Sequence, residues 1–393
     1  MKAILSVVLV MTGLAAGSAR AQDLMTQKKT FGPFDFTTQS GRELKGVKVG
    51  WESYGTLNAD KSNAILICHY FSGSSHAAGK YAAADPAPGY WDAIIGPGKA
   101  IDTNRYYVLS SDTLVNLGAN DPAVITTGPA SIDPLTNKPY AMDFPIVTIR
   151  DFVEVQKRLV ESLGISRLVM VAGPSMGSLQ TYEWAASYPD MVGKIMPVIG
   201  ALDTDANLVA WLDVWATPIR LDPKWQNGNY YGGEPPLAGL AESLKVITLQ
   251  ANHWRWANKS FAGPAGAKWA REGEDPAKSF ANQYQVEQAL ADAGAARAKT
   301  SDANHLLYLI KANQLFAGGD AKAKLSRIKA PALIIYQPED QVFQAAFVES
   351  TARMLAANGV KVETVQLKGD RGHLDGVLTI KQAEAAVAAF LAR

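Results

Sequence analysis

The amino-acid sequence predicts an α/β protein in which a mostly parallel sheet of about eight strands is flanked by helices and carries an inserted helical lid. Two observations favour this class. Short β-type runs alternate with helical patterns along the chain, and the runs at 64–68, 168–172 and 332–336 are almost entirely apolar. Apolar runs of this kind are typical of strands that are covered on both faces, as in a parallel sheet.

The individual elements follow from the period of the hydrophobic pattern. Helical spacing of apolar residues predicts helices over 151–163 and 180–187. The β-type runs predict strands at 47–54, 64–69, 106–111, 168–172, 195–199, 332–336 and 360–367.

From about residue 205 to residue 320 clear strands stop, and helical patterns alternate with Gly- and Pro-rich breaks. This change predicts a helical lid, 205–320, inserted into a core made of residues 22–204 and 321–393. The lid holds six of the nine tryptophans, including Trp211 and Trp215. Such residues suit an apolar pocket or a subunit interface, and packing of the lid onto the core is the alternative for any single one.

The first 21 residues have the pattern of a secretory signal peptide, with Lys2 at the start and an apolar run at 4–16. That run is about 13 residues long, short of the roughly 20 that span a bilayer, and no later segment is long enough. We expect cleavage near Ala21 and Gln22, a periplasmic or secreted mature protein, and no stable membrane insertion. An uncleaved N-terminal anchor is the alternative.

The charge balance, 38 basic and 37 acidic side chains, gives a formal net charge of +1. Nothing in this balance favours nucleic acid or an anionic membrane, so we expect a small-molecule substrate. The single cysteine, Cys68, excludes an internal disulfide framework and a multi-cysteine metal site, and its apolar surroundings predict a buried structural thiol. We expect neither a metal ion nor an organic cofactor.

A candidate nucleophile, Ser175, lies in the pentapeptide Gly173-Pro174-Ser175-Met176-Gly177. The pentapeptide follows the strand predicted at 168–172 and leads into a helical pattern. This is the strand, G-x-S-x-G turn and helix of the α/β-hydrolase fold, in which flanking glycines let the backbone pass closely while the serine hydroxyl projects from the sheet.

A serine hydroxyl needs a base to accept its proton, and the chain offers five histidines. In this fold the triad partners follow the serine in the order acid, then histidine, on loops after late strands. His373 follows the last predicted strand, whereas His253 and His305 fall inside the predicted lid. We therefore expect His373 to be the base.

The acid is expected after the strand at 332–336, where Glu339 and Asp340 offer two carboxylates. We choose Asp340, whose role would be to hold the imidazole in the correct tautomer and orientation. Glu339 is the competitor. Asp370 is disfavoured because it is too close in sequence to His373 to reach it from another strand.

Acyl transfer also needs N–H donors aimed at the tetrahedral oxyanion. The amide after the nucleophile, that of Met176, is the first expected donor, and the second should come from the loop 69–76, which follows an early strand. An ordinary polar turn is the alternative for that loop.

Together these segments resemble the homoserine O-acetyltransferase family of α/β-hydrolases, also called MetX-like. The resemblance implies Ser175, Asp340 and His373 as the catalytic triad and the Phe71 and Met176 amides as oxyanion donors. It also implies a helical lid that contributes to a homodimer. The matching stretches recur in family order across most of residues 45–378, at 69–79, 96–103, 128–132, 144–151, 175–177 and 372–373.

Two positions depart from the family pattern. Family acetyltransferases have an arginine in an R-Q-A-I-x-x-D-P segment that grips the homoserine carboxylate, and alignment on Asp222-Pro223 puts Ala216 at that position. The family's His-Asp pair, whose aspartate meets the substrate amine, becomes His373-Leu374, with Asp375 one place further on. Alanine cannot replace a bidentate arginine contact, and Arg220 is the alternative source of that charge.

These features predict a serine carboxylesterase that hydrolyses short-chain acyl esters. An exported enzyme would lack acetyl-CoA, a cytoplasmic metabolite, and would meet abundant water. This resembles the exported esterase branch of the family. The alternatives are an O-acetyltransferase acting on homoserine or a related alcohol, and a non-catalytic binding protein on the same fold. The residues expected to line the substrate pocket are Tyr70, Trp211, Trp215, Ala216 and Leu374.

Overall fold

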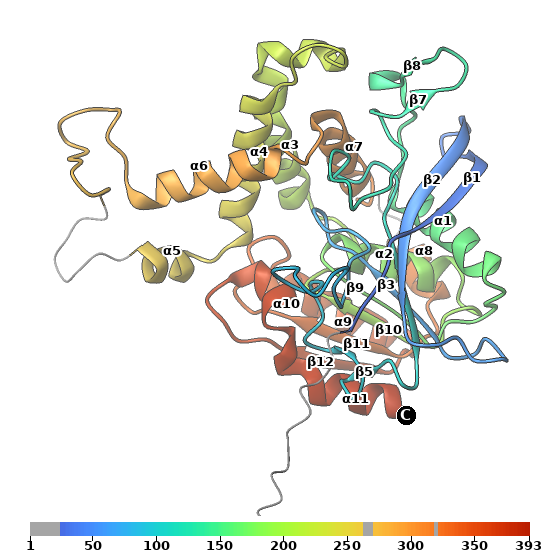
Figure 1. Ribbon diagram of the computed structural model, residues 1–393. Coiled ribbons are helices and arrows are strands. Elements are labelled where there is room, and N and C mark those ends of the chain that lie inside the picture. Colours follow the sequence, from blue (N-terminus) through green and yellow to red (C-terminus); the bar gives the residue numbers. More distant parts are fainter. Residues whose placement is uncertain (1–23, 262–269, 318–320) are drawn as a thin grey trace, which may run out of the picture.

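The structure, a computed structural model, describes residues 24–261, 270–317 and 321–393 and is built on an eight-stranded sheet (Figure 1). The strand β2 is antiparallel to its neighbours β1 and β6, and all other neighbouring strands are parallel. This confirms the predicted α/β class with a mostly parallel sheet. In order across the sheet, the strands are Lys29–Thr37 (β1), Glu43–Tyr54 (β2), Tyr107–Ser111 (β6), Ala64–Cys68 (β3), Met170–Pro174 (β9), Ile195–Val198 (β10), Ala332–Tyr336 (β11) and Val362–Gln366 (β12).

Successive residues of the central strands pack into two separate cores. In β3, Leu66 and Cys68 belong to the core on one face of the sheet, and Ile65 and Ile67 belong to the core on the other. The first core includes residues of the helices Ile149–Ser162 (α1), Met176–Ser187 (α2) and Ala345–Ala357 (α9), and the second includes residues of Glu384–Ala392 (α11). Both faces are therefore covered, which explains the continuous apolar runs in the sequence. Cys68 is fully buried, as expected.

The edge strand β1 was not among the strands that the sequence analysis predicted. Gly32 and Pro33 interrupt its alternation, and its register against β2 shifts between Phe31 and Phe34. Proline has no N–H to donate to a neighbouring strand, so it is tolerated at a sheet edge or a bulge. A pattern broken in this way gives no clear strand signal.

The chain between β10 and β11 adds no strand to the central sheet among the described residues and forms helices, of which α3, α4, α6 and α7 lie above the sheet in Figure 1 and α5 lies to its left. We call α3 to α7 the cap helices. Within this group α4 packs against α3 and α6, and α3 packs against α7, whereas α8 returns to the core and contacts α2. Their bounds are Ala206–Leu221 (α3), Leu237–Ala251 (α4), Trp254–Phe261 (α5), Gln285–Ala298 (α6), Ala303–Gln314 (α7) and Ala321–Arg327 (α8).

The remaining elements are short. Two small sheets pair Ile95–Gly96 (β4) with Ile101–Asp102 (β5) and Ile132–Asp133 (β7) with Lys138–Pro139 (β8). The short helices are Ala141–Asp143 (η1), Pro223–Gly228 (η2), Gly372–Leu374 (η3), Asp375–Leu378 (α10) and Ile380–Ala383 (η4).

The predicted signal peptide, residues 1–21, lies outside the described residues. Within the described part of the chain, no helix combines the length and the apolar character needed to cross a bilayer.

Candidate active site

The candidate nucleophile, Ser175, lies at the turn between β9 and α2. Its backbone has φ of 56° and ψ of −121°, a strained conformation for a residue with a side chain. A Cβ atom on Gly173 would lie 2.5 Å from the Cys68 carbonyl oxygen, and one on Gly177 would lie 2.2 Å from the same atom. Because only glycine fits at these two places, the turn can pass against β3 and present the serine hydroxyl at the end of the sheet.

The structure brings Ser175, His373 and Asp340 into one hydrogen-bonded chain. His373 Nε2 lies 2.8 Å from Ser175 Oγ, and His373 Nδ1 lies 2.7 Å from Asp340 Oδ2. The three side chains are almost fully buried, and the ring of Phe343 stacks beside the imidazole with centroids 6.0 Å apart. This arrangement can activate a hydroxyl as a nucleophile, because the imidazole accepts its proton while the carboxylate holds the imidazole in place.

Asp340 is fixed by its own backbone surroundings. Its Oδ1 accepts hydrogen bonds from the amides of Val342 at 2.7 Å and Phe343 at 3.0 Å. These two bonds leave Oδ2 aimed at the histidine and prevent the carboxylate from rotating away.

The two competing carboxylates have other partners. Glu339 forms an ion pair with Arg255 on α5, and Asp370 forms one with Lys259 at 2.7 Å. Both pairs are at least partly exposed to solvent, and neither carboxylate bonds to His373. The structure therefore places Asp340, and not its neighbours, in the position of the triad acid.

The histidines at 69 and 305 have structural partners. His69 is fully buried, with Nδ1 2.7 Å from the carbonyl oxygen of Tyr70, and its Nε2 accepts from the amide of Thr113 at 3.2 Å. His305 Nδ1 lies 2.8 Å from the carbonyl oxygen of Asn116. Burial lowers the pKa of both imidazoles, so each remains neutral. Their ring nitrogens hold nearby backbone groups in place through hydrogen bonds.

The amides of Phe71 and Met176 are candidates for the oxyanion hole. Met176 begins α2 directly after the nucleophile, and Phe71 lies on the loop 69–76 that follows β3. Among the residues that the structure describes, neither amide donates to a protein acceptor. A helix N-terminus favours negative charge, so both the free donors and the local dipole suit a tetrahedral oxyanion.

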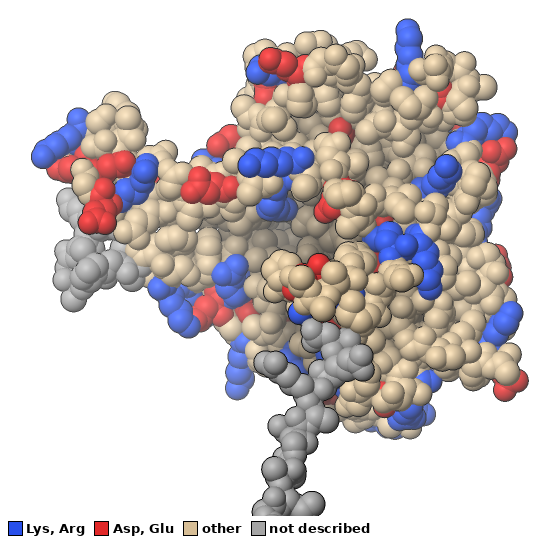
Figure 2. Space-filling view, in the orientation of Figure 1, with Lys and Arg blue, Asp and Glu red and all other residues tan. Residues whose placement is uncertain are grey.

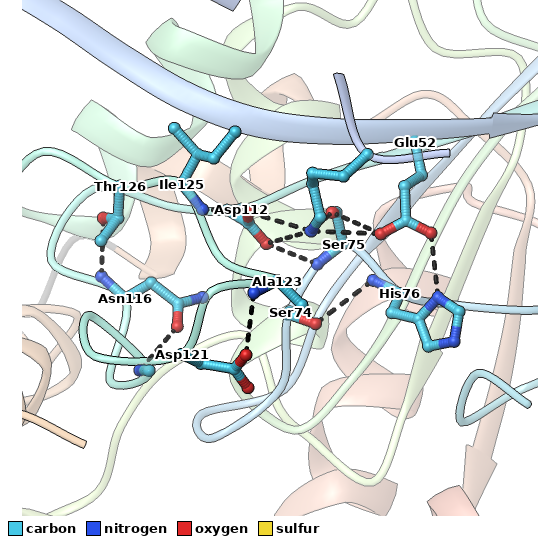
Figure 3. A network of polar contacts seen from close by, with 12 residues as sticks. Glu52, Ser74, Ser75, His76, Asp112, Asn116, Asp121, Ala123, Ile125 and Thr126 are labelled. Carbon is cyan, nitrogen blue, oxygen red and sulfur yellow. Dashed lines mark hydrogen bonds and ion pairs between the residues drawn. The ribbon is translucent and has the colours of Figure 1, made fainter. Parts of the chain in front are cut away.

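A buried polar network holds the loop that carries Phe71 (Figure 3). The carboxylate of Glu52 accepts from the hydroxyl of Ser75 at 3.0 Å and lies 3.0 Å from His76 Nδ1. Asp112 accepts from the amide of Ser75 at 2.7 Å, and the Lys28 ammonium lies 3.1 Å from Glu52 and 3.2 Å from Asp112. The network fixes one end of the loop, while His69 fixes the other. The amide of Phe71, the candidate oxyanion donor, therefore lies between two anchored ends of its loop.

The pKa of Glu52 reflects this network. Burial by itself would raise it, but the hydrogen bond from His76, the positive charge of Lys28 and the hydrogen bond from Tyr81 outweigh burial and hold the pKa at about 2. The carboxylate is therefore ionised in the folded protein at any physiological pH.

The network predicts a loss of stability in acid. Because the folded-state pKa of Glu52 lies below the ordinary value of 4.5, its contribution is complete above pH 4.5 and disappears as the pH falls toward 2. The shift corresponds to roughly 3 kcal/mol of unfolding free energy. Urea unfolding measured from pH 6 to pH 2 should show this loss, and the Glu52→Gln variant should show a shallower dependence. Glu363→Gln, which removes an exposed carboxylate paired with Arg393, is the matched control and should keep the wild-type slope. Equal slopes for the Glu52 variant and the wild type would contradict the prediction.

A cavity of about 340 Å³ opens in front of the triad. In Figure 2 this face of the molecule is hollowed between the cap helices and the core, with both basic and acidic side chains around the border of the hollow. Of the residues expected to line the pocket, Tyr70, Trp215 and Leu374 are in the cavity wall together with Phe71. The other lining residues include Ile247, Ala251, Val342, Val377, Leu378, Arg297 and Arg371.

Two expected pocket residues lie elsewhere, and the expectation needs correction. Trp211 lies one turn before Trp215 on α3 and lines a separate depression beside α5. Ala216 is buried and lies against a third depression, on another face of the same helix. Trp211 and Trp215 are one turn, about 6 Å, apart along the axis of α3, and Ala216 is rotated by about 100° from Trp215, so only Trp215 of the three reaches the triad cavity.

Arg220, the alternative source of the missing positive charge, is also absent from the described wall of the cavity, and so is Asp375. Arg220 is exposed and forms an ion pair with Asp213 at 2.6 Å. Asp375 is fully buried and accepts from the amide of Arg371 at 3.2 Å, so it shapes the loop before His373 and does not face the substrate. Its pKa is raised by burial.

Several wall residues were not identified from the sequence. Ile247 and Ala251 come from α4, and Arg297 comes from α6, segments that carry no motif. The only available signal was the helical pattern of 205–320, which predicts that helices cover the site without saying which helix faces it.

Comparisons with known proteins agree with this geometry. The chain matches the family described as alpha/beta hydrolase fold over residues 64–375. The homoserine O-acetyltransferase of Deferribacter desulfuricans is 37% identical over 364 residues, covering 91% of this chain and 93% of the relative. Among solved structures, esterase E22 is 49% identical with a TM-score of 0.88 and covers 93% of this chain and all of its own. The homoserine O-acetyltransferase of Bacillus anthracis is 35% identical with a TM-score of 0.88, covering 94% of this chain and 98% of its own.

Proposed function

Since the chain belongs to the MetX-like homoserine O-acetyltransferase family of α/β-hydrolase-fold enzymes, we propose that it transfers acyl groups through a covalent acyl-enzyme at Ser175. We further propose that water is its main acyl acceptor, so that the protein acts as a carboxylesterase on small acyl esters. The observation that carries the second step is that the described wall of the triad cavity holds no acidic side chain and that Leu374 follows the catalytic histidine.

In the proposed mechanism, Ser175 Oγ attacks the ester carbonyl carbon while His373 Nε2 accepts the hydroxyl proton. The amides of Phe71 and Met176 stabilise the oxyanion, and Asp340 stabilises the imidazolium. His373 then gives the proton to the departing alcohol oxygen, which leaves the acyl group on the serine. Water attacks this acyl-enzyme, again with His373 as base, and the acid is released.

The cavity supports hydrolysis because the described part of its wall offers no partner to the ammonium group of an amino-acid acceptor. Homoserine carries an ammonium group, and burying that charge without a carboxylate is costly. Among the described residues that line the cavity there is neither Asp nor Glu, and Leu374 presents an alkyl side chain beside the imidazole. A small uncharged ester or a water molecule meets no such cost.

The second candidate is an O-acetyltransferase that moves the acetyl group of acetyl-CoA to homoserine. The names of the relatives favour it: relatives called homoserine O-acetyltransferase match about nine-tenths of this chain, and on those names alone it is the better supported of the two. The name of esterase E22 and the wall of the cavity favour hydrolysis. The acyl acceptor is thus the property to measure.

We also propose that the protein is exported, on the pattern of its first 21 residues, and that the cap helices contribute to a homodimer. Exposed apolar side chains on these helices, among them Leu221 and Trp254, support the second proposal.

Measuring both acceptors in one purified preparation tests the function. We expect hydrolysis of 4-nitrophenyl acetate and butyrate, and transfer from acetyl-CoA to homoserine that is at least about a hundredfold slower, because an unpaired ammonium costs a few kcal/mol in this cavity. The two rates are followed by nitrophenolate absorbance and by release of free CoA thiol. Efficient homoserine acetylation with negligible ester hydrolysis would establish the second candidate and reject the first.

A further inference from the structure

Arg297, a cation with no acidic partner among the described residues, lies in the wall of the triad cavity. It belongs to the last turn of α6 and lines the same cavity as Ser175 and His373. Thr248 and Tyr70 lie in the same wall. The mechanism proposed above gives this guanidinium no role.

Its hydrogen bonds occupy only part of the guanidinium. Nη1 donates to Thr248 Oγ1 at 2.8 Å and approaches the carbonyl oxygen of Leu244 at 3.4 Å. Both partners are on α4, so these bonds hold the side chain in place. In the described part of the chain, Nε and Nη2 have no protein acceptor, and neither atom is sealed from solvent.

Arg297 differs from several arginines elsewhere on the cap helices and in the core that have acidic partners. Arg220, Arg255 and Arg150 each pair with a carboxylate. No Asp or Glu of the described residues forms an ion pair with Arg297. Burial lowers the pKa of this guanidinium, which shows that the surroundings oppose its charge. A guanidinium in the cavity wall with free N–H donors and no acidic partner among the described residues is suited to bind an anionic ligand.

A second arginine makes the cavity positive. Arg371 lies in the same wall, with its guanidinium 5.0 Å from the ring centroid of Trp256, and its buried Nε has no hydrogen-bond partner. The described wall therefore holds two arginines and no acidic side chain. The carboxylate nearest to the chemistry, that of Asp340, is engaged by His373.

We propose that Arg297 binds a carboxylate of the substrate, so that the preferred substrates are small esters with a carboxylate at a distance from the reacting carbonyl. This rests on the proposed function, whose cavity of about 340 Å³ has room for a small ester. The planar guanidinium offers paired N–H donors that match the two oxygens of a carboxylate.

Matched ester pairs test the proposal. Monomethyl succinate against methyl butyrate places the carboxylate on the acyl side, and 3-butyryloxypropionate against propyl butyrate places it on the alcohol side. Hydrolysis is followed by acid release in a pH-stat. For one of the two pairs, kcat/KM should be at least about tenfold higher for the anionic ester, the size expected for a hydrogen bond to a charged group.

Two variants examine the residue itself. Arg297→Gln should bring the ratio of anionic to neutral kcat/KM close to one, whereas Arg297→Lys, which keeps the charge, should retain part of the ratio. Lys299→Gln removes one positive charge from the exposed end of the same helix, outside the cavity wall, and should keep the wild-type ratio. A ratio is used because loosening of α6 would affect both esters of a pair.

Binding to the Ser175→Ala variant provides a readout that does not depend on turnover. Titration calorimetry should show tighter binding of the anionic ester, and adding Arg297→Gln should remove the difference. Equal binding of both esters would overturn the inference while leaving the hydrolase proposal intact. An Arg297→Gln effect confined to the KM for acetyl-CoA would also overturn it, because the bound anion would then be a phosphate of the thioester donor. Absence of all ester hydrolysis alongside preferential anion binding would instead reject the hydrolase and keep the carboxylate site.

Discussion

Replacing Ser175 with alanine should lower kcat for ester hydrolysis by about a millionfold, because the triad acts as a unit and its loss leaves only binding and oxyanion stabilisation. The hydroxyl lies 2.8 Å from His373 Nε2, at a strained turn that presents it at the end of the sheet. Nitrophenyl acetate hydrolysis, with the background rate subtracted, measures the loss.

Covalent labelling separates this role from simple binding. A fluorophosphonate probe should add to the wild-type protein once, at Ser175, and should not add to the Ser175→Ala variant. The Ser178→Ala variant is the matched control and should still be labelled at Ser175. The Ser178 hydroxyl donates to the Ser175 carbonyl oxygen at 2.7 Å and is buried away from the cavity. An unlabelled wild-type protein would favour the non-catalytic binding protein named as an alternative above.

Replacing Asp340 with asparagine should lower kcat by about ten-thousandfold. An asparagine side chain can still accept the bonds from the Val342 and Phe343 amides, so the loop should keep its shape. The amide cannot stabilise an imidazolium, and its NH₂ group would favour the wrong imidazole tautomer, in which Nε2 carries the proton and cannot accept one from the serine.

The neighbouring carboxylate provides the control. Glu339→Gln removes an acid one residue away, and that acid is paired with Arg255 on α5 and has no contact with the imidazole. Its kcat should stay within about threefold of wild type, as expected for a partly exposed ion pair. A loss at Glu339 comparable to that at Asp340 would mean that the triad acid has been assigned to the wrong residue.

The candidate nucleophile and base could be predicted from the sequence because their signals are local or few in number. Ser175 lies between a strand and a helix that are adjacent in the chain, and the two glycines beside it are required by backbone approach. His373 follows the last long strand, and the other histidines fall in earlier segments. Neither assignment depends on knowing how distant segments pack.

The acid was harder to assign from the sequence, since Glu339 and Asp340 are adjacent and chemically alike. Only the folded loop distinguishes them. The hydrogen bonds from the amides at 342 and 343 turn one carboxylate inward, and Arg255, which is distant in sequence, draws the other outward.

The sequence by itself determined the α/β sheet, the strand, turn and helix around Ser175, and the order in which its partners follow, because these depend on hydrophobic period and local backbone sterics. Only the tertiary structure shows which residues form the wall of the cavity. Trp211 and Ala216 lie outside that wall, whereas Arg297 and Arg371, from distant segments, belong to it. Glu52 accepts a hydrogen bond from Ser75 in the loop 69–76. Such contacts depend on how helices rotate and pack over the sheet, and that rotation is set by long-range packing that no local pattern records.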